Sequence, residues 1–155
     1  MHYIFNEGIT VGSVNRLMEK LEGEEKIVLW FSTDGGNIDP MRCLIRFFNS
    51  LGDNIEIVLT DELCSAGTMI LTDYTGKLTQ DGLDFILFHK WDRLVYTLRK
   101  SCIINESKMN EQDGNNNKNF SKKLKKLGLN KKQLKKYKQG KDVILYKEDF
   151  KQINL

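Results

Sequence analysis

The spacing of hydrophobic and polar residues predicts a helix and two buried strands in the first sixty positions. Between Val11 and Leu21, apolar residues recur at the three- and four-residue spacing of a helix, with Ser13 placed as its N-cap. Ile27 to Phe31 is a nearly unbroken apolar run, typical of a strand covered on both faces. Ile55 to Leu59 is a second run of the same kind.

A glycine turn and a second helix separate these two strands. Ser32 to Asn37 (STDGGN) interrupts the apolar pattern, and Asp39-Pro40 predicts the N-cap and first residue of a helix that reaches Phe48. Strand, turn, helix and strand form a βαβ unit, whose right-handed crossover makes its strands parallel. A third apolar run, Phe85 to Phe88, leads directly into His89. The pattern predicts an α/β fold with a mainly parallel sheet and functional groups at strand ends.

The last third of the chain is polar and then strongly basic. Helical potential continues over 91–104, and the asparagine-rich stretch 105–119 predicts a mobile linker or loop. Lys118 to Lys141 holds 11 lysines and no acid, with leucines interleaved, and predicts one or two basic helices. Val143 to Tyr146 predicts an edge strand. We therefore expect a core over 1–104, a linker over 105–119, and a lysine-rich segment over 120–155 that completes the same domain.

Composition narrows the class of protein. A chain of 155 residues with 40% hydrophobic content suits one domain with a core of its own. No apolar run approaches the roughly 20 residues of a membrane helix, and the first ten residues lack the features of a secretory signal, so a cytoplasmic protein is expected. The three cysteines have no CxxC spacing, which favours reduced thiols over disulfides or a zinc site. No phosphate-loop motif is present, and neither a cofactor nor a metal is expected.

The net charge of +3 conceals an asymmetry. Residues 1–117 carry 11 basic and 18 acidic side chains, whereas residues 118–155 carry 13 basic and 3 acidic ones. Any surface that attracts an acidic partner is therefore confined to the last quarter of the chain.

Three local features offer the parts of a serine hydrolase, namely a hydroxyl, a base and backbone donors for an oxyanion. Ser65 follows a strand and precedes a short helical start at Thr68. His89 ends a later strand, and His2, the other histidine, lies at the terminus. Gly35-Gly36 can bring bare N–H groups close to a substrate. Each feature alone has an ordinary structural reading, as an N-cap, a strand-end histidine and a tight turn.

The order of these three features along the chain favours the functional interpretation over the ordinary structural one. The segments IVLWFSTDGGNI (27–38), LCSAG (63–67) and FILFH (85–89) together resemble the proteolytic subunit of Clp protease within the crotonase-like superfamily, and YIFNEGI (3–9) is similar to the family's first strand. The resemblance covers about Tyr3 to His89. It implies a Clp protease/crotonase-like fold of repeated ββα and βαβ units with a mainly parallel sheet.

The resemblance also implies the roles of individual residues. Ser65 corresponds to the nucleophile, His89 to the general base, and the N–H groups of Gly36 and Ala66 to the oxyanion hole. The acid that orients the histidine has no direct counterpart, because the family position falls on Lys138. Asp142 is the nearest acid and is taken as the orienting group, with Asp92 and Asp84 as the other options.

The sequence departs from the family at several other points. Asp34 stands where a proline is expected, Asp61-Glu62-Leu63-Cys64 replaces Gly-Gln-Ala-Ala, and Lys90-Trp91 replaces Gln-Pro. Cys64, beside Ser65, is the alternative nucleophile, although an interior thiol is more often a packing residue.

The leading hypothesis is a serine peptidase that acts on peptides or unfolded proteins. The resemblance implies a homo-oligomer, with a ring as one form of it, and an ATPase partner of unknown identity. A catalytically inactive scaffold of the same fold is the main alternative. Nucleic-acid binding through the lysines, and an acyl-CoA enzyme on the same fold, are weaker alternatives.

Overall fold

The chain forms two compact units. The computed structural model describes residues 1–90 and 103–153, with side chains for 1–90 and 115–153. The first unit comprises Met1–Phe88 and Ile144–Leu155, and the second comprises His89–Val143. The chain leaves the first unit after its fourth strand and returns to it within its last strand.

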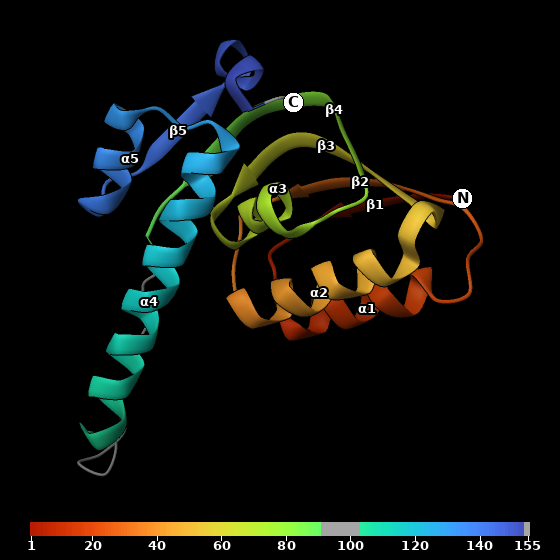
Figure 1. Cartoon of the computed structure of the whole chain (residues 1–155). Coiled ribbons are helices and arrows are strands. Elements are labelled where there is room, and N and C mark those ends of the chain that lie inside the picture. Colours follow the sequence, from red (N-terminus) through yellow and green to blue (C-terminus); the bar gives the residue numbers. More distant parts are fainter. Residues whose placement is uncertain (91–102, 154–155) are drawn as a thin grey trace. The chain divides into compact units, whose positions relative to one another are not determined.

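A mostly parallel five-stranded sheet forms the framework of the fold (Figure 1). Its strands follow the chain order, and the first four pair with one another in parallel. The predicted α/β fold and mainly parallel sheet are therefore confirmed. The strands are β1 (His2–Asn6), β2 (Ile27–Thr33), β3 (Ile55–Cys64), β4 (Lys77–Phe88) and β5 (Val143–Tyr146).

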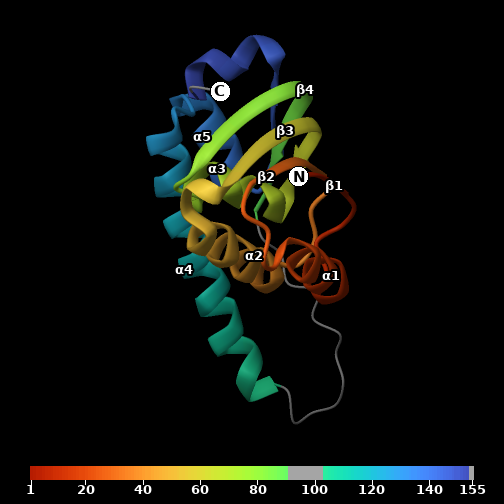
Figure 2. The ribbon, with the colours of Figure 1, turned by 90° about the vertical axis from the view of Figure 1, so that its right-hand side faces the viewer.

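Two helices cover one face of this sheet. Helices α1 (Val11–Leu21) and α2 (Ile38–Leu51) lie side by side beneath β1 to β3 in Figures 1 and 2. The alternation of side chains along each strand gives the sheet an apolar inner face, and Leu29, Ile57 and Phe48 are completely buried there. The rings of Phe5 and Phe31 stack at 5.1 Å between their centroids. This core holds the carboxyl ends of the strands at fixed positions.

Both helices have N-caps other than those predicted, although α1 spans Val11–Leu21 as the sequence pattern indicated. Thr10, not Ser13, is the N-cap of α1, because its side chain accepts the N–H of Ser13 while the Ser13 hydroxyl accepts the N–H of Thr10. This reciprocal pair is a capping box. Helix α2 begins one residue before Asp39, with Asn37 at the N-cap, so Pro40 is its third residue. Proline is tolerated there because the first N–H groups of a helix have no acceptor within it.

The strands are longer than their apolar runs. Strand β3 continues five residues beyond Leu59 as far as Cys64, and β4 begins at Lys77 rather than Phe85. The added residues include Asp61 and Glu62, which the hydrophobic pattern did not identify as strand. Asp61 has a positive φ of 49°, and the pairing register of β3 shifts on both sides of it. Beyond this irregularity β3 continues to Cys64 and ends directly before Ser65.

The second unit is helical and polar. Helix α4 spans Ile103–Leu127 and α5 spans Lys131–Lys138, as the basic-helix prediction required. The linker predicted over 105–119 was wrong, because this stretch lies inside α4. Asparagine disfavours a helix by only about 0.7 kcal/mol per residue, which tertiary contacts readily offset. The helix predicted over 91–104 lies mostly outside the described residues.

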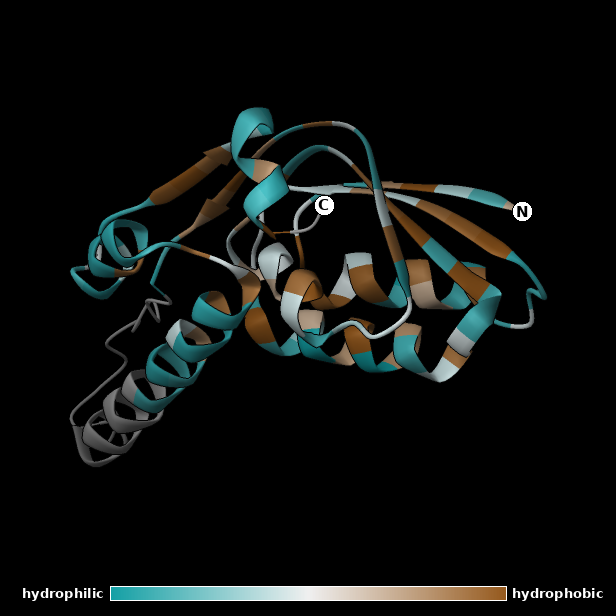
Figure 3. Ribbon diagram, turned by 45° about the horizontal axis from the view of Figure 1, so that its top comes forward, coloured by the Kyte–Doolittle hydropathy of each residue, from teal (hydrophilic) through white to brown (hydrophobic). Residues whose placement is uncertain are grey.

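A small apolar core holds the helices of the second unit together. Figure 3 shows α5 and the described part of α4 as largely hydrophilic. Phe120 and Leu124 of α4 are nevertheless buried, as are Leu129 and Tyr137. The rings of Phe120 and Tyr137 lie 6.1 Å apart between centroids. Among the described residues, no helix is long and apolar enough to cross a membrane.

Candidate active site

Ser65 lies where β3 ends and a short 3₁₀ helix (Ser65–Met69) begins, followed by α3 (Ile70–Asp73). Its φ is 52°, in the left-handed region that costs a residue with a side chain about 1–2 kcal/mol. The Thr68 hydroxyl donates to the Ser65 carbonyl at 2.6 Å and braces this turn. Residues held in such strained conformations cluster at functional sites. The half-buried Ser65 therefore has the backbone setting of a nucleophile presented by a sharp strand-to-helix turn.

The glycine turn after β2 packs directly against Ser65. A Cβ atom added to Gly35 would lie 2.5 Å from the Ser65 Cβ, closer than real Cβ contacts come, and 3.2 Å from its Oγ. The φ of Gly35 is also positive, at 103°. Thr33 secures the turn, because its hydroxyl accepts the Gly35 N–H at 3.0 Å and donates to the Glu7 carbonyl at 2.9 Å. Only glycine fits at position 35.

The second glycine presents its N–H toward the Ser65 side of the turn. The Gly35 carbonyl accepts the Ile9 N–H at 2.6 Å, so it points toward Ile9. In a trans peptide the next N–H, that of Gly36, points the opposite way. Ile9 follows β1, and β3 lies on the other side of β2. The Gly36 N–H is therefore directed toward the side of the turn that β3 and Ser65 occupy.

The Ala66 N–H is the other donor that the sequence predicted. Ala66 is the second residue of the 3₁₀ helix, whose first N–H groups have no acceptor within the helix. It points away from the Ser65 carbonyl, which is engaged by Thr68. Close packing holds this segment in place, because a Cβ on Gly67 would lie 2.3 Å from the Thr33 Cγ2.

The neighbouring thiol is in an unfavourable setting for nucleophilic chemistry. Burial, and after it the nearby Glu62 carboxylate, raise the pKa of Cys64 to about 12. The Cys64 thiol donates to the Glu62 Oε2 at 3.8 Å. Because the thiolate is the reactive form of cysteine, Cys64 stays inert near neutral pH. The packing interpretation of Cys64 is thus favoured over the nucleophilic one.

His89 follows β4, the strand next to β3. Cys64 pairs with Leu87 in the parallel register, so the residue after Cys64 is Ser65 and the second residue after Leu87 is His89. Both residues therefore emerge from the carboxyl ends of adjacent strands, where parallel sheets place their sites. His89 itself is the first residue of the second unit.

Within the second unit, His89 shares a pocket with the acid expected to orient it. His89, Lys90, Gly140 and Asp142 line a cavity of about 290 Å³. Asp142 directly precedes β5, and Gly140 has a positive φ of 75°. Fifty-three residues of sequence separate His89 from Asp142, yet the fold places them around one space.

The other candidate acids differ from Asp142. Asp84 lies on β4 and forms an ion pair with Lys147 at 2.8 Å. Asp92 lies outside the described residues. Lys138, the position that the family resemblance assigns to the acid, lines a different pocket. Among the described residues, no group of three or more His, Cys, Asp or Glu side chains could hold a metal ion.

The structure adds two residues that the sequence interpretation missed. Thr33 and Thr68 fix the glycine turn and the Ser65 turn through their hydroxyl groups. A threonine two residues before the glycine pair, and another three residues after the serine, were the available signals.

No protein-family model matches the chain. No curated protein matches it either.

Proposed function

We propose that this protein is a serine hydrolase in which Ser65 attacks a carbonyl carbon and His89 accepts its proton. The observation that carries the proposal is Ser65 itself, a non-glycine residue with a φ of 52° at the end of a central parallel strand, packed against the bare backbone of Gly35. A strained serine at this position is costly for stability, and functional sites are where such strain is retained.

Two backbone donors supply the electrostatic part of the mechanism. The N–H groups of Gly36 and Ala66 flank Ser65 from two different turns and are proposed to bind the oxyanion of the tetrahedral intermediate. Donors of this kind are already oriented in the folded protein, so they need no reorganisation during the reaction. Each commonly contributes a factor of about 10²–10³ to the rate.

His89 and Asp142 supply the proton transfer. In the proposed mechanism the imidazole takes the Ser65 proton and later returns it to the leaving group, while Asp142 holds the ring in the required tautomer. Their shared pocket supports Asp142 over the other acids.

The substrate class rests on the resemblance to Clp peptidases rather than on the site geometry. We propose a peptide or unfolded protein as the substrate, a Clp protease-like arrangement of the fold, and assembly into a homo-oligomer. An ATPase partner is part of the same proposal.

The nucleophile is tested by labelling with a fluorophosphonate, followed by intact mass measurement and hydrolysis of short fluorogenic peptides. The wild-type protein should gain one adduct and turn over peptide, whereas Ser65→Ala should do neither. Ser50→Ala is the matched control, because Ser50 is an exposed serine on α2 whose hydroxyl donates only to the Phe47 carbonyl.

Two results would sink the assignment. Labelling that persists unchanged in Ser65→Ala would place the nucleophile elsewhere. A folded wild-type protein that is neither labelled nor active would instead support the inactive scaffold.

A further inference from the structure

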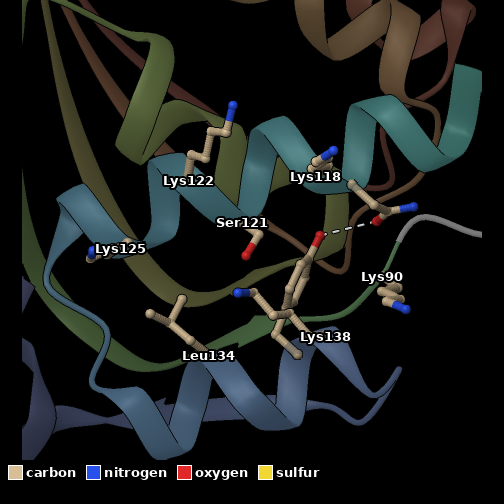
Figure 4. Close-up of a pocket in the computed structure, with 9 residues that line it drawn as sticks. Lys90, Lys118, Ser121, Lys122, Lys125, Leu134 and Lys138 are labelled. Carbon is tan, nitrogen blue, oxygen red and sulfur yellow. Dashed lines mark hydrogen bonds between the residues drawn. The ribbon is translucent and has the colours of Figure 1, made fainter.

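A second cavity lies between α4 and α5, within the second unit (Figure 4). Its volume is about 530 Å³, inside the range of roughly 300–1,000 Å³ typical of small-molecule sites. The cavity is lined mainly by lysines, together with two hydroxyl-bearing side chains, an amide and a leucine: Lys90, Lys118, Lys122, Lys125, Lys138, Ser121, Tyr137, Asn117 and Leu134.

The charge of this pocket is unbalanced. Five of its nine lining residues are lysines and none is acidic. Within the part of the chain that the structure describes, none of these five lysines forms an ion pair. A concave site lined by one sign of charge concentrates the field that attracts an oppositely charged ligand. The lining of the pocket therefore carries an excess of positive charge that attracts anions.

A hydrogen bond between two lining residues, Tyr137 and Asn117, holds part of the pocket wall in place. Tyr137 is buried, and its hydroxyl donates to the Asn117 Oδ1 at 3.1 Å. Burial raises the pKa of Tyr137, so the phenol stays neutral and adds no negative charge. The phenol ring and Leu134 provide an apolar wall beside the ammonium groups.

Figure 4 shows how the polar groups are directed. The Ser121 hydroxyl and the Lys138 ammonium point into the space between the two helices. The Lys122 ammonium points away from it, so Lys122 contributes mainly its carbon chain. Among the labelled lysines, Lys138 is the one whose ammonium Figure 4 plainly shows directed into this space, so Lys138 and Ser121 are the groups best placed to contact an anion.

We propose that this pocket binds a small organic molecule that carries two or more phosphate groups. One phosphate monoester brings a charge of about −1.5 to −2 near neutral pH, so a diphosphate matches the positive charge of a pocket lined by five lysines better than a carboxylate does. The lysine ammonium is a compact point charge that suits phosphate oxygens, and the Ser121 hydroxyl adds a donor. The apolar wall of Leu134 and Tyr137 faces the organic body of the ligand. A pocket of this size favours such a molecule over an extended nucleic acid.

The test is calorimetric titration of the full chain with ADP, pyrophosphate and adenosine. ADP and pyrophosphate should bind at one saturable site, and adenosine should not. Lys125→Gln and Lys138→Gln should each weaken ADP binding about tenfold, since a hydrogen bond to a charged group contributes about 1.5 kcal/mol. Lys126→Gln and Lys135→Gln are the matched controls, because they remove the same charge from the same two helices outside the pocket.

The outcomes separate the alternatives. Equal weakening by pocket and control variants would show attraction to the whole basic surface and overturn the proposal. So would the absence of saturable ADP binding up to about 1 mM, well above the affinities expected of a built phosphate site. Affinity for single-stranded oligonucleotides that rises with length and exceeds that for ADP would favour nucleic acid instead. Ser65→Ala should bind ADP normally, so this result stands apart from the proposed hydrolase activity.

Discussion

The two units of the chain differ in charge and in how their cores are filled. Counted on the sequence, the first unit holds 8 basic and 16 acidic residues, and the second holds 16 basic and 5 acidic ones. The first unit buries a continuous apolar layer between its sheet and two helices, whereas the described helices of the second unit rest on a few side chains such as Phe120 and Tyr137.

This difference suggests a division of tasks. The sheet of the first unit supplies rigidity, which lets it hold Ser65 in a strained conformation at a strand end. The second unit carries an excess of basic residues, five of which line the pocket between α4 and α5. The predictions below change one residue at a time in either unit, beginning with the largest expected effect.

Asp142→Asn should lower kcat by about 10⁴, because an amide holds the imidazole in the wrong tautomer. The measurement is steady-state peptide hydrolysis. Asp84→Asn is the control, since Asp84 is a surface acid of the first unit paired with Lys147, and its rate should stay within about twofold of wild type. Comparable losses in both variants would remove Asp142 from the mechanism.

The two described thiols should differ about 10³-fold in their reaction with iodoacetamide at pH 8. The pKa of Cys64 is raised to about 12, whereas Cys43 is exposed on α2. At pH 8 the Cys64 thiolate is therefore scarce, and burial slows access further. Peptide mapping after timed alkylation measures both rates, and rapid alkylation of Cys64 in the folded protein would contradict its inert role.

The raised pKa of Cys64 also has a consequence for stability. Its proton is held more tightly in the folded state than in the unfolded state, so folding is favoured fully below about pH 9. That contribution is lost as the pH rises from about 9 toward 12. Tyr74, whose pKa is raised to about 12 mainly by burial, acts in the same direction.

Tyr137→Ala should destabilise the second unit by about 3–5 kcal/mol, because a large buried ring is removed from a small core. Tyr137→Phe should cost only about 1 kcal/mol, the net contribution of the hydrogen bond to Asn117. Hydrogen exchange of α4 and α5 measures both effects. If the amides of β2 and β3 lost as much protection, the two units would unfold as one.

Ser65→Gly should raise the free energy of unfolding by about 1 kcal/mol relative to Ser65→Ala, since glycine relieves the positive φ. Urea denaturation compares the two variants, neither of which has a hydroxyl. Thr68→Gly, at a position without a positive φ, is the control and should be destabilising. A Ser65→Gly protein no more stable than Ser65→Ala would show that the turn is unstrained.

The pattern of apolar residues along the chain predicted much of the fold. The apolar runs at Ile27 and Ile55 predicted buried strands because such runs gain free energy only when both faces are covered. The periodicity from Val11 predicted α1 because a helix with one apolar face is stabilised when that face is buried. The N-cap assignments were less accurate, because Thr10 and Ser13 are both good caps and only the chain path before them decides which one is used.

The polar stretch 105–119 marks where sequence patterns were insufficient. Its asparagines favour loops, yet the helix that contains it is fixed by contacts with distant side chains, such as that between Phe120 and Tyr137. Local preferences of a few tenths of a kcal/mol per residue are easily overridden by such packing.

For the candidate site, the sequence suggested Ser65, His89 and the glycine pair, through their order along the predicted strands and the family resemblance that this order carries. Only the tertiary structure decided that Gly35 touches Ser65, that Ser65 is strained, and that Asp142 shares a pocket with His89. It also gathered lysines from three separate parts of the chain around one cavity. Proximity between residues far apart in sequence depends on how the elements pack, and no local pattern carries that information.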